Sequence, residues 1–116
     1  MAVMMHTQST KIERMKKAVN ALISDIKSRT FPADKIILFG SIAKDCIHER
    51  SDMDICIVSE EELTIPQKRE IENYFFDMVQ DEFVPDFVYC NIDTLKTGTQ
   101  VFSSIRNEGK VLYERV

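Results

Sequence analysis

Two aspartates, Asp52 and Asp54, stand two residues apart at the start of an apolar segment that continues to Val58. Successive side chains of a strand point to opposite faces, so both carboxylates are expected on the same face. Carboxylate oxygens are the ligands that Mg²⁺ prefers, and bound Mg²⁺ commonly shares its coordination with a nucleotide's phosphates. The pair therefore predicts a metal site for a metal-nucleotide complex.

A glycine-serine turn and a third carboxylate accompany this pair. Gly40 and Ser41 follow the apolar residues 35–39, and Asp86 lies within the apolar segment 84–89. Glycine adopts conformations closed to other residues, and the backbone N–H groups of such a turn, together with a serine hydroxyl, can hold a phosphate. Each motif alone is common in proteins that bind no nucleotide. Their occurrence together, in this order, is what indicates nucleotide chemistry.

Composition narrows the class of protein. The chain has 116 residues, 44% of them hydrophobic, which predicts one domain over residues 1–116. A net charge of -4 argues against nucleic-acid binding, which needs clustered Lys and Arg. No signal peptide or membrane-spanning segment is expected. Three cysteines without a C-x-x-C spacing predict reduced thiols and a cytoplasmic location.

The elements that must position these residues follow from hydrophobic periodicity. We expect an α/β (α+β) fold with a small central mixed β-sheet flanked by helices, which pack mainly on one face. Capping boxes are predicted at Thr10 with Glu13 and at Thr64 with Gln67. The expected order is helix 9–29, strand 35–39, strand 53–58, a helix from Thr64, strand 84–89, helix 99–107 and strand 110–113.

These residues resemble the minimal nucleotidyltransferases of the DNA polymerase β-like superfamily, whose signature is G-S-x-A, then S-D-x-D, then a carboxylate on a later strand. The resemblance extends to residues 105–114. It implies the polymerase β-like fold, with Gly40 and Ser41 holding a triphosphate. It implies that Asp52, Asp54 and Asp86 are catalytic and bind two Mg²⁺ ions. One departure is Asp45, where many relatives carry glycine, and its effect on the phosphate loop stays open.

The function implied by the resemblance is Mg²⁺-dependent transfer of a nucleoside monophosphate to a hydroxyl acceptor. The expected donor is ATP, which would supply AMP, or another nucleoside triphosphate, which would supply its own monophosphate. A domain this short has little surface with which to enclose a small-molecule acceptor. We therefore expect a partner chain or a homo-oligomer interface to present the acceptor. The resemblance implies a HEPN-domain toxin as this partner, modified on a tyrosine within a toxin-antitoxin system. Base preference, the acceptor and the number of nucleotides transferred stay open.

Two other functions are open. The first is a non-catalytic antitoxin or regulatory subunit that keeps only the fold. The closely spaced carboxylates argue against this function. Buried like charges destabilise a fold, and a surface that only binds a partner does not require them. The second is an antibiotic-modifying nucleotidyltransferase, which needs a further domain to complete its acceptor pocket.

Overall fold

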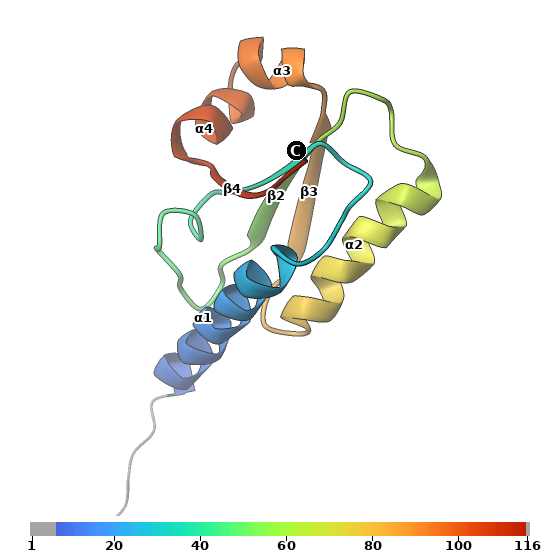
Figure 1. Ribbon diagram of the computed structural model, residues 1–116. Helices are drawn as coiled ribbons and strands as arrows, with labels where there is room; N and C mark the ends of the chain where they lie inside the picture. Colours follow the sequence, from blue (N-terminus) through green and yellow to red (C-terminus); the bar gives the residue numbers. More distant parts are fainter. Residues whose placement is uncertain (1–6, 116) are drawn as a thin grey trace, which may run out of the picture.

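A computed structural model describes residues 7–115, and a four-stranded mixed sheet lies at its centre (Figure 1). The strand order is β3-β2-β1-β4. β1 is antiparallel to both β2 and β4, whereas β2 and β3 are parallel. The mixed sheet with its flanking helices confirms the expected α+β class. The strands are β1 (Lys35–Phe39), β2 (Met53–Val58), β3 (Pro85–Cys90) and β4 (Lys110–Glu114).

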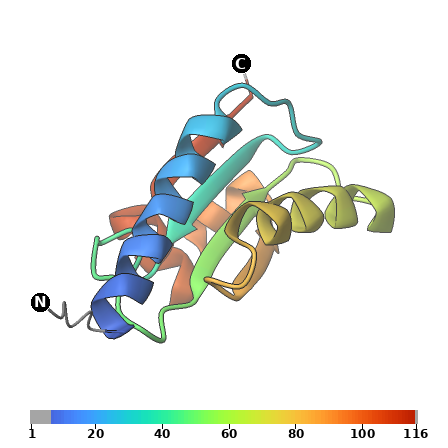
Figure 2. The same cartoon turned by 90° about the horizontal axis from the view of Figure 1, so that it is seen from below.

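Helices cover both faces of this sheet (Figures 1 and 2). The long helices α1 (Thr7–Ile26) and α2 (Ile65–Val79) pack on one face, where Leu22 and Phe75 are fully buried. The short helices α3 (Ile92–Thr97) and α4 (Val101–Glu108) pack on the other face through Leu95 and Ile105. The expectation that helices lie mainly on one face is therefore corrected. Coverage on both sides explains why β1 and β2 are apolar at nearly every position.

One of the two predicted helix starts is wrong. Thr10 lies inside α1, which already includes Thr7, so Thr10 and Glu13 form no capping box. The α2 capping box is confirmed: the Gln67 N–H donates to Thr64 Oγ1 (3.3 Å) and the Thr64 N–H donates to Gln67 Oε1 (2.8 Å). α1 also ends at Ile26, three residues before the predicted end.

Helix α3 was not expected from the sequence. Six residues are too few to show helical periodicity, and the available signals were the cap residue and the glycine that follows. Asn91 Oδ1 accepts from the Thr94 N–H (2.8 Å), and Gly98 follows the last turn. Arg106 of α4 donates to the Leu95 carbonyl oxygen (2.8 Å), which ties the two short helices together. Among the described helices, none is long and apolar enough to cross a membrane.

Candidate active site

The predicted site residues meet where β1 ends and β2 and β3 begin. In Figure 1 this is the end of the sheet away from α3. The register pairs Phe39 with Asp54 across the antiparallel strands, and Asp54 with Asp86 across the parallel ones. Because strand side chains alternate, Asp54 and Asp86 project from the same face as Cys56, which packs with the α3 and α4 core. Asp54 is half-buried, whereas Asp52 and Asp86 are exposed.

The three carboxylates interact electrostatically. The pKa of the Asp54 carboxyl is raised above its ordinary value, first by burial and then by the negative charges of Asp86 and Asp52. Within residues 7–115, however, no three His, Cys, Asp or Glu side chains converge closely enough to hold a metal ion. The fold therefore brings the predicted ligands into one neighbourhood, without closing them around a single point. Mutual repulsion of like charges opposes such convergence.

Gly40 lies against the side chain of Asp54. Its φ is +79°, a left-handed conformation that side chains disfavour. A Cβ atom at this position would overlap Asp54 Oδ2, so glycine is required both by the backbone conformation and by the available space. The absence of a side chain leaves the backbone of the turn open beside the carboxylate. A phosphate could approach backbone N–H groups there.

The turn after Gly40 is closed by its own backbone. The Cys46 N–H donates to the Ser41 carbonyl oxygen (2.8 Å), and the Lys44 N–H donates to that of Gly40 (3.4 Å). Asp45 has a φ of +58°, in a region where aspartate is tolerated better than most residues. This accounts for the departure noted in the sequence, because the position favours glycine and aspartate also fits it.

Two contacts of the loop were not expected from the sequence. Lys44 Nζ forms an ion pair with Glu108 Oε2 at the end of α4 (2.5 Å), which links the turn to the far part of the chain. Ser51 is buried, and its Oγ accepts from the His48 N–H (2.9 Å). Ser51 therefore fixes the loop that delivers Asp52. The local S-D-x-D motif signalled the serine, but no spacing rule could have linked Lys44 to Glu108.

A family model described as polymerase beta, nucleotidyltransferase matches residues 21–116, which is most of the chain. The chain belongs to the polymerase beta nucleotidyltransferase family. No curated protein is significantly similar to it in sequence.

Three solved structures share the fold of this chain. A toxin-antitoxin structure with AMP-PNP has a TM-score of 0.53 at 21% identity, covering 86% of this chain and 73% of that one. A mutant of the toxin-antitoxin MntA-HpeT has a TM-score of 0.51 at 20% identity, covering 87% and 73%. A putative nucleotidyltransferase from Sulfolobus solfataricus has a TM-score of 0.50 at 17% identity, covering 97% and 91%. At these identities the likeness establishes the fold.

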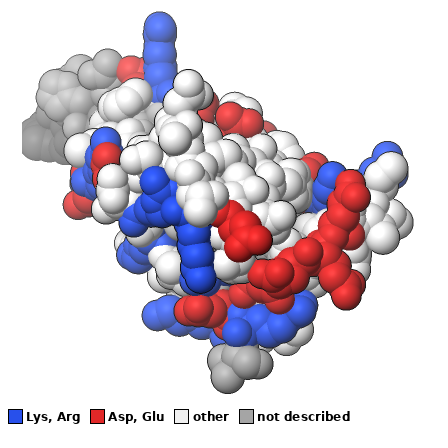
Figure 3. All heavy atoms as spheres, turned by 90° about the horizontal axis from the view of Figure 1, so that it is seen from above, with Lys and Arg blue, Asp and Glu red and all other residues white. Residues whose placement is uncertain are grey.

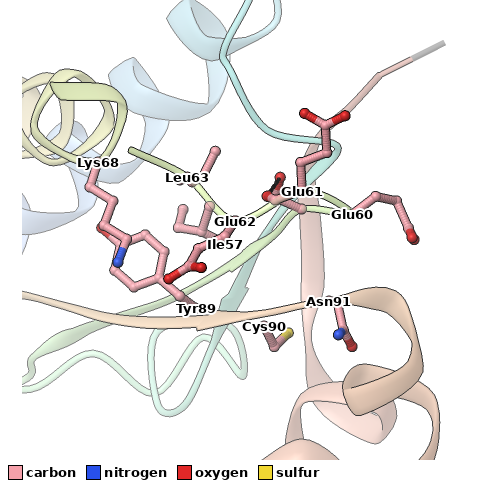
Figure 4. A pocket seen from close by; sticks show the side chains of 10 residues that line it. Ile57, Glu60, Glu61, Glu62, Leu63, Lys68, Tyr89, Cys90 and Asn91 are labelled. Carbon is pink, nitrogen blue, oxygen red and sulfur yellow. Dashed lines mark hydrogen bonds between the residues drawn. The ribbon is translucent and has the colours of Figure 1, made fainter. Parts of the chain in front are cut away.

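A pocket lies at the other end of β2 and β3, away from the aspartates, and Figure 4 shows the side chains that line it. Its volume is about 330 Å³, and Figure 3 shows acidic side chains gathered on this end of the molecule. Lys68 Nζ lies 4.9 Å from the centre of the Tyr89 ring, and the Tyr89 hydroxyl donates to Glu72. The lining residues are Ile57, Ser59, Glu60, Glu61, Glu62, Leu63, Lys68, Tyr89, Cys90 and Asn91. None of the predicted site residues is among them.

Proposed function

We propose that this chain is a Mg²⁺-dependent nucleotidyltransferase that moves AMP from ATP onto a hydroxyl group, and that a tyrosine of a HEPN-type toxin is the acceptor. The observation that carries the proposal is that Asp52, Asp54 and Asp86 lie at the same end of the β2–β3 pair, near enough for the charges of Asp52 and Asp86 to raise the pKa of Asp54, in a chain of this family. A carboxylate whose pKa is raised like that of Asp54 is typical of catalytic sites. Two structures of the same fold are toxin-antitoxin structures, one of them with AMP-PNP.

The donor set suits Mg²⁺. Asp52, Asp54 and Asp86 supply only carboxylate oxygens, which are hard ligands, and their like charges interact already. A cation among them would relieve the repulsion that raises the pKa of Asp54. In the proposed role, Asp52 and Asp54 would hold the ions, with Asp86 as a further ligand. Two Mg²⁺ ions would neutralise phosphate charge and make the acceptor hydroxyl more acidic.

The remaining steps fall to the protein's own groups. The backbone of Gly40 and the hydroxyl of Ser41 bind the terminal phosphates of ATP and orient the α-phosphorus for in-line attack. Asp86, exposed on the same face as Asp54, accepts the proton of the acceptor hydroxyl. The attacking oxygen then bonds to the α-phosphorus as the bond to pyrophosphate breaks. Ser51 acts as a positioning residue through its hydrogen bond to the loop.

The proposal is tested by incubating the purified chain with Mg²⁺ and each α-³²P-labelled nucleoside triphosphate, with and without the protein encoded by the adjacent gene. We expect label from ATP on that partner, and no label when Asp54→Asn replaces the wild type. Glu70→Gln is the matched control, since it removes one exposed carboxylate of α2 that belongs neither to the group of aspartates nor to the pocket at the other end of the sheet. A complex that forms but never carries label would favour a non-catalytic antitoxin instead.

Domain extent and location are also proposed. We take residues 1–116 as one nucleotidyltransferase domain, supported by a family match that begins at residue 21. A cytoplasmic location is proposed from the free cysteines Cys46, Cys56 and Cys90.

A further inference from the structure

The two edge strands of the sheet are protected to very different degrees. β4 carries Lys110 and Glu114 at its ends, and Glu114 Oε2 lies 3.3 Å from Lys35 Nζ. Such charges are a common means of preventing an exposed edge from pairing with another chain. β3 contains no lysine or arginine, and its protection is limited to Pro85 and Asp86 at its start. The β3 edge is therefore the one left available for a partner.

The outward backbone groups of β3 can be assigned from its pairing with β2. The Met53 N–H donates to the Val84 carbonyl oxygen (3.2 Å) and the Ser59 N–H donates to that of Cys90 (2.9 Å). Backbone direction alternates along a strand, so even-numbered residues of β3 face β2. The N–H and C=O groups of Phe87 and Tyr89 consequently point to the free edge. They can pair with an added extended segment.

Apolar side chains flank this edge. Val84 is 66% exposed immediately before the strand, and Phe76 of α2 is 46% exposed with its ring centre 6.2 Å from that of Phe87. An added strand would cover both. Negative charge lies at both ends of β3: Asp86 near the start, and beyond Tyr89 the pocket walled by Glu60, Glu61 and Glu62 (Figures 3 and 4). The charge complement of this edge is a basic segment.

We propose that the β3 edge binds an extended, basic segment of the acceptor protein as a fifth strand. Its hydroxyl-bearing residue lies opposite Asp86, and a lysine or arginine three residues away lies opposite Tyr89. Residues three apart on a strand point to opposite faces. One therefore meets Asp86 on the face of Asp54, and the other enters the acidic pocket on the face of α2. This inference rests on the proposed function, because it concerns how the acceptor reaches the same site.

Peptide selection without nucleotide tests the binding. Mixtures of ten-residue peptides, each with Ser, Thr or Tyr fixed at the fifth position and mixed residues elsewhere, are passed over the immobilised chain. We expect retained peptides to be enriched in lysine or arginine three positions from the fixed residue. Replacing that basic residue by alanine in a selected peptide should weaken binding about tenfold, equivalent to about 1.4 kcal/mol. Retention without this spacing would overturn the proposal.

Variants of the two edges supply the controls. Tyr89→Pro removes one outward N–H, and Val84→Lys places a charge beside the β3 edge; both should abolish retention. Val111→Lys, at an exposed position on β4, should leave it unchanged. Equal effects of Val84→Lys and Val111→Lys would contradict the proposal, as would a dimer through β3 that retains no peptide. Asp54→Asn should retain peptides normally, so loss of transfer and loss of docking are separable.

Discussion

The two ends of the β2–β3 pair are both acidic, yet they differ in how the acids are held. At one end, Asp54 is half-buried beside Asp52 and Asp86, and Gly40 lies directly against its carboxylate. At the other, Glu60, Glu61 and Glu62 are exposed along a pocket of about 330 Å³. The comparison sets a group of interacting carboxylates against a hollow as two candidate signs of a functional site. Crowding of like charges is the stronger sign, because a fold keeps it at a cost in stability.

The largest expected effect comes from breaking the crowded end. Asp54→Asn should lower nucleotide transfer by more than about 100-fold, because metal-ion catalysis contributes several kcal/mol to transition-state stabilisation. Glu61→Gln at the exposed end should lower the rate by no more than about tenfold, since this residue bears on docking of the acceptor and not on the chemical step. The rates are measured with labelled ATP and the partner protein. Comparable losses in the two variants would remove the distinction between the ends.

Gly40→Ala should impair both transfer and folding. The new Cβ overlaps Asp54 Oδ2, and the positive φ is strained for alanine, so we expect a loss of about 1–3 kcal/mol in the free energy of unfolding. Urea denaturation measures it. Asp54→Ala in the same chain removes the overlapped atom, so the double variant should be more stable than the sum of the single effects. Simple additivity would mean that the contact is unimportant.

Asp54 should make stability depend on pH. Its raised pKa means that the folded state holds a proton that the unfolded state has already released, so stability falls as pH rises from 3.8 through the folded pKa. The Asp54→Asn variant has no carboxyl group at this position, so it does not lose this stability as the pH rises. The melting temperature of Asp54→Asn relative to wild type should therefore be higher at pH 7 than at pH 3. A difference that shrinks as pH rises would contradict the crowding; Glu61→Gln serves as the control.

The smallest effect is expected in the turn of the crowded end. Asp45→Gly relieves a left-handed backbone, but adds chain entropy to the unfolded state, so a net gain of about 0.5 kcal/mol in stability is expected. Asp45→Ala keeps the strained conformation and should bring no gain. Urea titrations of both variants provide the comparison. A gain with alanine as large as with glycine would show that the charge of Asp45, rather than its φ, is responsible.

The sequence predicted the parts of this architecture that depend on local patterns. β1 and β2 have the predicted bounds because both are continuous apolar runs, and the α2 cap follows from Thr64 and Gln67. Helix α3 was not predicted, because a cap residue and six helical residues show little hydrophobic periodicity. The helix start predicted at Thr10 was wrong, because the same capping pattern of residues also occurs inside helices. Coverage of the second face depends on where α3 and α4 fold back, which is a tertiary property.

The candidate site divides in the same way. Alternation along a strand predicted that Asp52 and Asp54 share a face, and the pairing of Asp54 with Asp86 follows once the strands are parallel neighbours. Two other features depend on segments that only folding brings together. They are the ion pair of Lys44 with Glu108 and the close approach of Gly40 to Asp54. The roles of the three aspartates, and of Gly40 and Ser41, stay predictions until metal and nucleotide binding are measured.

The most direct measurement is an NMR titration of the isotope-labelled chain with Mn²⁺ and AMP-PNP, in which paramagnetic broadening marks the residues nearest the ion. We predict that the amide signals of Gly40, Asp54 and Asp86 broaden first, and that Asp54→Asn abolishes this. Broadening centred on residues 59–63, with the signals of the aspartates unchanged, would contradict the account. It would place the metal-nucleotide complex at the opposite end of the sheet.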